Sequence, residues 1–247
     1  MKQAKVLDIR IDLLTKSELL QEIKMSIDEG LKKEIFTVNN EFVVDAQSSP
    51  KFKQILNSSD INIADSTGVI WALKRQGIVG EKLPGADIFL DICELSKKNK
   101  YRIYLLGGID NAGSRAASAL KLKFEGLEIA GVTENIAIST TKVDHDLIKK
   151  INASKPDIVF VALGAPRQET WIRNNKNLIN SKIFMGIGGT LDYVSGVVPR
   201  APDFMRDLGL EWLYRLIMQP SRYKRIYKAL VTFPSMVRRE TTAGSNS

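Results

Sequence analysis

The sequence predicts an α/β fold in which a mostly parallel sheet is covered by helices on both faces. Strand-like and helix-like segments alternate along the 247 residues, and the strand-like segments are almost continuously apolar. The composition, 44% hydrophobic and 26% charged, is typical of a globular protein. This length suits one sheet domain over residues 1–196, a basic helical appendage over 197–240 and a disordered tail over 241–247.

Each element follows from a local signal. Thr15 and Glu18 form a capping box that opens the first helix, and other helices are expected where apolar residues recur every three or four positions. Strands are expected at short apolar runs that end in glycine or polar residues. The expected strands are 34–38, 61–64, 102–108, 127–132, 157–164 and 182–189, and the helices are 15–30, one after 40, 67–77, 85–98, 111–124, 144–152 and 167–177.

Single cysteine and histidine residues restrict the chemistry. Because Cys93 is alone, no internal disulfide can form and a cysteine metal site is not expected. His145 is the only histidine, so a Ser-His-Asp triad would depend on this residue. It begins a polar stretch that resembles the first turn of a helix, and we expect it on the surface.

The amino-terminal stretch has no apolar segment of signal-peptide length, and no later window is apolar enough to span a membrane. We therefore expect a cytoplasmic protein. The net charge is +8, and residues 200–247 hold nine Lys or Arg against four Asp or Glu. Most of the basicity thus lies in the appendage and indicates a polyanionic partner, namely nucleic acid, anionic lipid or a diphosphate.

Polar residues follow four of the predicted strands. In a parallel sheet the carboxyl ends of the strands share one edge, so these residues are expected to meet in one cleft. They are Thr37 and Asn39, then Asp65, then Arg167, Gln168 and Glu169, and finally Gly188, Gly189 and Asp192.

Each of these features also has an ordinary explanation. Asp65 taken alone would cap the next helix, and Gln168 and Glu169 taken alone would be solvated. The turn YLLGGIDNAG either is a tight connection or brings backbone N–H groups near a phosphate, and it departs from the dinucleotide pattern G-x-G-x-x-G. The chain contains no P-loop motif for nucleotide binding. The four strand ends carry no D-x-D pair, so no metal site is predicted.

Taken in order, the motifs resemble those of the WecG/TagA/CpsF family of bacterial glycosyltransferases over residues 5–230. The matching stretches are T-V-N (37–39), AD-x-x-G (64–68), LPGADI (83–88), YLLGG (104–108), PDIVFVALGAPRQE (156–169), GIGGTLD (186–192), G-x-x-x-RAP (196–202), GLEWLYRL (209–216) and P-x-R-x-x-R (220–225).

The resemblance implies a Rossmann-like domain that transfers a sugar with inversion, without metal or cofactor, from a UDP-sugar to undecaprenyl-diphosphate-linked GlcNAc. The best-known members use UDP-N-acetylmannosamine and begin the linkage unit of wall teichoic acid. Others use UDP-ManNAc-uronate or UDP-glucose for other surface polysaccharides. It also implies a peripheral protein on the inner face of the cytoplasmic membrane, held there by its appendage, and a homo-oligomer is plausible.

The resemblance also assigns roles to residues. Asp65 would be the general base, and positive charge from the appendage would stabilise the leaving diphosphate, a task suited to the guanidinium fork. The catalytic set is therefore Asp65, Arg215, Arg222 and Arg225. The expected substrate-binding residues are Thr37, Asn39, Lys82, Gly108, Arg167, Gln168, Gly188 and Asp192.

Two departures from the family pattern bear on the substrate. Lys82 stands where the family usually has arginine, and TENIAI (133–138) replaces an aromatic element near the donor, which leaves the donor sugar open. Three competing hypotheses remain: a basic nucleic-acid-binding module, a Rossmann oxidoreductase, and a family member that has become an inactive scaffold. Of these, nucleic acid is not expected as a partner, because the basic segment follows a catalytic-looking domain.

Overall fold

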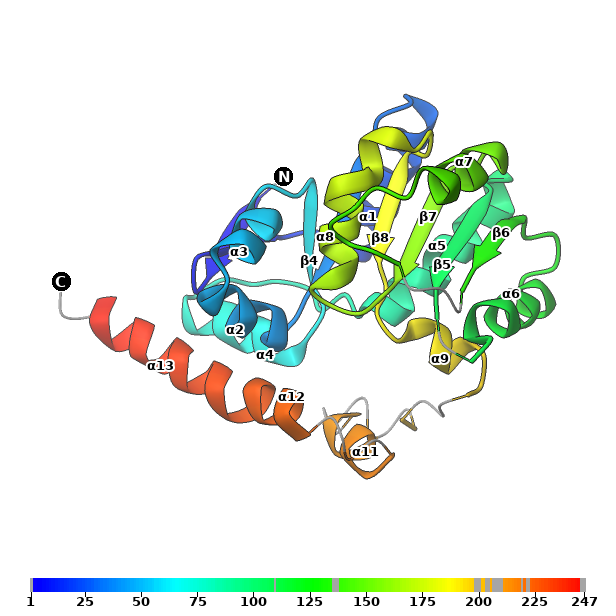
Figure 1. Ribbon diagram of the computed structural model, residues 1–247. Coiled ribbons are helices and arrows are strands. Elements are labelled where there is room, and N and C mark those ends of the chain that lie inside the picture. Colours follow the sequence, from blue (N-terminus) through cyan, green and yellow to red (C-terminus); the bar gives the residue numbers. More distant parts are fainter. Residues whose placement is uncertain are drawn as a thin grey trace.

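A six-stranded, all-parallel sheet organises the computed structural model, with strand order β4-β3-β8-β7-β5-β6 (Figure 1). The structure describes residues 2–108, 110–134, 138–197, 201–202, 205, 211–218, 220 and 223–244, without the side chains of 211, 215 and 241–244. The strands are β3 (Lys33–Val38), β4 (Ile61–Ala64), β5 (Ile103–Gly107), β6 (Ile129–Thr133), β7 (Ile158–Ala162) and β8 (Ile183–Gly186). The predicted parallel sheet is confirmed.

Helices cover both faces of this sheet (Figure 1). Those of the sheet domain are α1 (Lys16–Asp28), α2 (Asn40–Ser48), α3 (Pro50–Asn57), α4 (Thr67–Arg75), α5 (Gly85–Asn99), α6 (Ala112–Lys123), α7 (His145–Ala153), α8 (Arg167–Asn175), the 3-10 turn η1 (Lys176–Leu178) and α9 (Thr190–Val194). The capping box at Thr15 and Glu18 is present, His145 is exposed, and Cys93 is buried. The expected alternation of strands and helices is thus confirmed.

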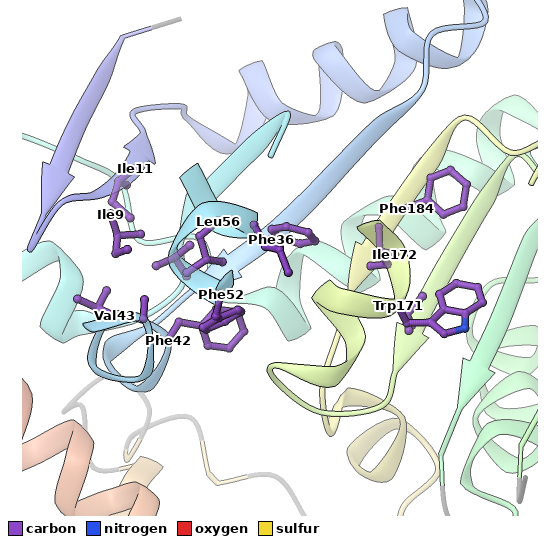
Figure 2. Packing of buried hydrophobic residues seen from close by; sticks show 14 of the residues in the cluster. Ile9, Ile11, Phe36, Phe42, Val43, Phe52, Leu56, Trp171, Ile172 and Phe184 are labelled. Atoms are coloured by element: carbon purple, nitrogen blue, oxygen red, sulfur yellow. The ribbon is translucent and has the colours of Figure 1, made fainter. Parts of the chain in front are cut away.

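Alternate residues of the strands pack into two separate cores. In β3, Phe36 and Val38 face the core under α2, α3, α4, α7 and α8, whereas Ile35 faces the core under α1, α5, α6 and α9. Figure 2 shows the first of these cores, where Phe36 and Phe184 of the sheet lie near Trp171 and Ile172 of α8. Burial on both faces explains why the central strands β5, β7 and β8 carry no charged residues.

An amino-terminal hairpin and the helices α3 and α9 had not been predicted. Strands β1 (Gln3–Val6) and β2 (Ile9–Asp12) form an antiparallel hairpin, whose two-residue turn has positive φ at both Leu7 and Asp8. The turn lacks the Asn-Gly or Asp-Gly signature of such hairpins, so no strong local signal predicts it. Helix α3 follows α2 directly, where Ser49 caps it and Pro50 occupies its first turn.

The carboxyl end forms the helices α11 (Glu211–Met218) and α12 (Tyr223–Tyr227), the π-helical segment η3 (Lys228–Thr232) and α13 (Phe233–Gly244). The predicted helical character is confirmed, and α13 extends into the segment expected to be a disordered tail. Segments η3 and α13 contact α2 and α4, and Phe233 and Val237 are buried in the first core. Within the described residues, no helix is long and apolar enough to cross a membrane.

Candidate active site

A cleft of about 460 Å³ lies at the carboxyl edge of the sheet. Its walls come from the ends of β3, β4, β7 and β8, from the first turns of α2 and α4, and from α11, α12 and η3. This is the edge where parallel α/β folds bind their ligands. The cleft brings together nine of the predicted site residues: Thr37, Asn39, Asp65, Lys82, Gly108, Gln168, Gly188, Asp192 and Arg225.

The Asp65 side chain is held at the wall of the cleft by a hydrogen bond from the backbone. Its Oδ1 accepts a hydrogen bond of 2.5 Å from the N–H of Gly85, the first residue of α5. The residue that caps α4 is Ser66, whose Oγ accepts from the N–H of Val69 at 3.3 Å. The alternative in which Asp65 caps the next helix is therefore wrong. The carboxylate lies at the end of β4, where it can face a ligand.

Thr37 and Asn39 shape the wall beside Asp65. Thr37 is buried, and a Cβ at Gly85 would lie 2.8 Å from its Cγ2, so glycine at this position lets the first turn of α5 pack closely against Thr37. Asn39 caps α2, because its Oδ1 accepts from the N–H of Phe42 at 3.1 Å. Both residues therefore line the cleft and also fix the backbone around it.

Gln168 and Glu169 are buried, so the alternative in which they are solvated is wrong. Gln168 Nε2 donates to Glu169 Oε1 at 2.7 Å, and its Oε1 accepts from the N–H of Gly188 at 2.9 Å. The amide is thus locked between α8 and the turn after β8. A side chain at Gly186 would collide with both residues, which explains the glycine at the end of that strand.

Complete burial raises the pKa of Glu169 to about 7, because the apolar surroundings penalise the charged form. Its Oε2 is buried without a hydrogen-bond partner in the described part of the chain. The folded state therefore binds the proton more tightly than the unfolded state, where a glutamate titrates near 4.3. The contribution of Glu169 to stability is present below that value and is lost as the pH rises to about 7.

We expect Glu169→Gln to flatten the pH dependence of stability. Between pH 5 and pH 8 the free energy of unfolding of the wild type should fall, relative to the variant, by on the order of 3 kcal/mol. Urea denaturation of both proteins at the two pH values measures this difference. Equal changes in the two proteins would show that Glu169 is ionised throughout.

The glycine turn after β5 contributes Gly108 to the cleft. Gly107 and Gly108 have φ of 102° and 92°, values open to glycine. The first turn of α6 is already occupied, since the carboxylate of Glu134 accepts from both the N–H and the Oγ of Ser114. The N–H of Ser114 is thus committed to a side chain, which favours the tight-connection interpretation of this turn.

The predicted cationic residues lie in different places. Arg225 lines the cleft and is 45% exposed, and its Nε donates to Glu41 Oε2 at 2.6 Å; Lys82 lines the cleft as well. Arg167 does not line the cleft, because its Nη2 donates to the carbonyl of Ile138 at 3.2 Å. Arg222 and the side chain of Arg215 lie outside the described residues, as does part of the TENIAI segment.

Sequence reasoning missed several residues of the cleft wall. Asn40, Ser66 and Tyr193 adjoin predicted site residues, and Ile226 and Leu230 come from the C-terminal helices. The Asn39-Asn40 pair was the one available signal, because two amides at a strand end exceed what a single cap needs. No sequence pattern indicated which face of the C-terminal helices packs against the sheet domain.

In the ranges that the structure describes, no three His, Cys, Asp or Glu residues are grouped closely enough to hold a metal ion. Among the described residues, the charged side chains at the cleft are the acids Glu41, Asp65 and Asp192 and the cations Lys82 and Arg225. These two cations are suited to stabilise negative charge on a ligand bound in the cleft.

A parallel sheet covered on both faces, with a polar cleft at its carboxyl edge, defines an α/β enzyme of the Rossmann-like class. The glycosyl transferase WecG/TagA/CpsF family matches residues 4–246. The chain belongs to this family and is a glycosyltransferase. The resemblance seen in the sequence motifs is thereby confirmed, and the nucleic-acid and oxidoreductase hypotheses are set aside.

Three relatives carry the name N-acetylglucosaminyldiphosphoundecaprenol N-acetyl-beta-D-mannosaminyltransferase. The Bacillus subtilis (strain 168) protein is 34% identical over 204 residues, which cover 82% of this chain and 78% of the relative. The Bacillus spizizenii protein is 33% identical over 201 residues, covering 81% and 77%. The protein of Staphylococcus aureus (strain MRSA252) is 29% identical over 224 residues, covering 90% and 87%.

Proposed function

We propose that the protein transfers N-acetylmannosamine from UDP-N-acetylmannosamine to undecaprenyl-diphosphate-linked GlcNAc, with inversion, in the synthesis of teichoic acid or another surface polysaccharide. The names of the relatives support the acceptor and the transferred sugar. The observation that carries the mechanism is Asp65, whose Oδ1 is fixed by the Gly85 N–H at the cleft wall.

In this mechanism Asp65 removes the proton from the acceptor hydroxyl. The oxygen then attacks the anomeric carbon from the face opposite the diphosphate, so that the new bond forms with inverted configuration. UDP leaves with the electron pair of the broken C–O bond, and Arg225 stabilises the growing negative charge. Thr37, Asn39, Gln168, Gly188 and Asp192 line the space in which donor and acceptor meet.

UDP-ManNAc-uronate and UDP-glucose remain alternative donors for the same chemistry. The test is a transfer assay with a soluble prenyl-diphosphate-GlcNAc acceptor, a panel of UDP-sugars and an excess of chelator, with products identified by mass. We expect one N-acetylhexosamine to be added from UDP-N-acetylmannosamine at the same rate with and without chelator. Addition of a different sugar would reassign the donor, and loss of turnover on chelation would contradict metal independence.

We further propose that the protein acts as a peripheral protein on the inner face of the cytoplasmic membrane. The support is an exposed group on the C-terminal helices that combines apolar side chains with basic ones. Ile217, Tyr223 and Tyr227 are 66%, 59% and 61% exposed, and Lys224 and Arg225 lie between the two tyrosines. Membrane-linked acceptors would be reached from this position.

Substitution of Ile217, Tyr223 and Tyr227 by serine is expected to abolish sedimentation with vesicles of one-third anionic lipid. Each substitution removes apolar area that would be buried in the lipid. The basic residues that remain contribute only about 1 kcal/mol each where they reach the membrane surface. The matched control replaces Leu122 and Val79, which are 88% exposed on other surfaces, by serine. Equal sedimentation of both variants would contradict the assignment.

A further inference from the structure

Asn40, the first residue of α2, contacts both the catalytic loop and the C-terminal helices. Its Oδ1 accepts from the hydroxyl of Ser66 at 2.7 Å, and Ser66 directly follows Asp65. Its Nδ2 donates to the main-chain carbonyl of Ala229, in η3, at 2.9 Å. The residue is 9% exposed and lines the cleft. One amide therefore joins segments that lie 189 positions apart in the chain.

The carbonyl that Asn40 reaches is available because of a proline. In η3 the N–H of Phe233 bonds to the carbonyl of Lys228, five residues earlier, as in a π-helix. The next bond of that pattern would join residue 234 to Ala229. Residue 234 is proline and has no N–H, so Ala229 lacks this helical donor. Asn40 supplies the missing hydrogen bond.

The surrounding backbone leaves room for this amide. A Cβ at Gly68 would overlap the side-chain amide of Asn40, so the first turn of α4 accommodates Asn40 only with glycine at this position. The glycine, the proline and the asparagine thus serve one contact from three different elements. If the C-terminal helices packed through apolar contacts alone, none of these three residues would be needed.

Among the described contacts between the C-terminal helices and the domain, the apolar contacts and the ion pairs restrict the register less than this hydrogen bond does. Phe233 and Val237 bury apolar surface, which holds α13 down but is not directional. The ion pairs of Arg225 with Glu41 and of Lys228 with Asp45 are partly exposed, and pairs of this kind contribute little. The Asn40 bond is directional and partly buried, with Asn40 itself only 9% exposed. Since Arg225 precedes Ala229 by about one turn, the position of its guanidinium follows from this bond.

We propose that Asn40 is a positioning residue that sets the register of α12, η3 and α13 against the cleft and thereby places Arg225 in its wall. The effect on catalysis rests on the proposed function, in which Arg225 stabilises the leaving diphosphate. The effect on register does not, because it concerns only the contact between Asn40 and Ala229.

The register is tested by native-state hydrogen exchange of the full chain. Asn40→Asp keeps the acceptor for Ser66 but places a carboxylate oxygen against the Ala229 carbonyl, and Asn40→Ala removes both bonds. We expect the amides of residues 228–233, 235 and 236 to exchange at least tenfold faster in both variants. The control is Gln47→Ala, which removes a similar amide-to-carbonyl bond, to Leu7, from the other end of α2. Wild-type exchange in the Asn40 variants, or equal acceleration in the control, would overturn the proposal.

The link to Arg225 is tested by a double-mutant cycle in the transfer assay. We expect Asn40→Asp to lower kcat at least tenfold in the wild-type background and less than twofold in the Arg225→Ala background. Losses of equal size in both backgrounds would overturn the link. If the wild type transferred no sugar at all, the proposed function would fail, and hydrogen exchange would still decide the role of Asn40.

Discussion

Asp65→Asn is expected to lower kcat for sugar transfer by about 10²- to 10⁴-fold, the usual contribution of a positioned general base. The amide keeps an oxygen for the Gly85 N–H, so the loop that holds residue 65 should stay in place. What is lost is the ability to take the proton of the acceptor hydroxyl. Steady-state kinetics of transfer, with UDP affinity measured by calorimetry, separates these two properties.

The matched control is Asp87→Asn, the same substitution in the first turn of α5. Asp87 lies two residues from Gly85 but does not line the cleft, so transfer should proceed at nearly the wild-type rate. Turnover by Asp65→Asn comparable to that of the control would remove Asp65 from the role of base. Loss of UDP binding by Asp65→Asn would show instead that the residue shapes the donor site.

The second large effect is expected for Arg225→Ala, with a fall in kcat of about 10²- to 10³-fold, as for the loss of one donor to a developing negative charge. In the structure the Arg225 guanidinium pairs with Glu41, and both side chains are partly exposed, at 45% and 24%. A pair of this kind is worth about 0–1 kcal/mol. A diphosphate, which offers bidentate, charge-assisted bonds, should therefore displace Glu41.

Arg225→Lys distinguishes charge from geometry at this position. Lysine keeps the charge but not the planar fork, so we expect it to recover only part of the lost rate. Lys224→Ala is the control, because it removes the same charge from the neighbouring residue, which does not line the cleft. Equal losses in Arg225→Ala and Lys224→Ala would point to the general charge of the appendage as the cause.

Most of the fold and much of the site could be predicted from local signals. Near-continuous apolar runs such as 157–164 required burial on both faces, and the capping box at Thr15 marked a helix start. Because polar residues follow the strand ends, the sequence also predicted that Thr37, Asp65 and Gln168 lie together in one cleft. It did not foresee the direction of Arg167, because the first residue of a helix can project toward either side of the strand edge.

The sequence by itself determined the class of fold, the family and the side of the sheet that holds the cleft. These follow from periodicity and from motif order, which are properties of neighbouring residues. Only the tertiary structure decided that Ser66 rather than Asp65 caps α4, and that Glu169 is buried with its pKa raised. Only the tertiary structure showed that Asn40 donates to the Ala229 carbonyl, which Pro234 leaves without a helical donor. A hydrogen bond between residues 189 positions apart depends on how the helices pack, so no local sequence pattern predicts it.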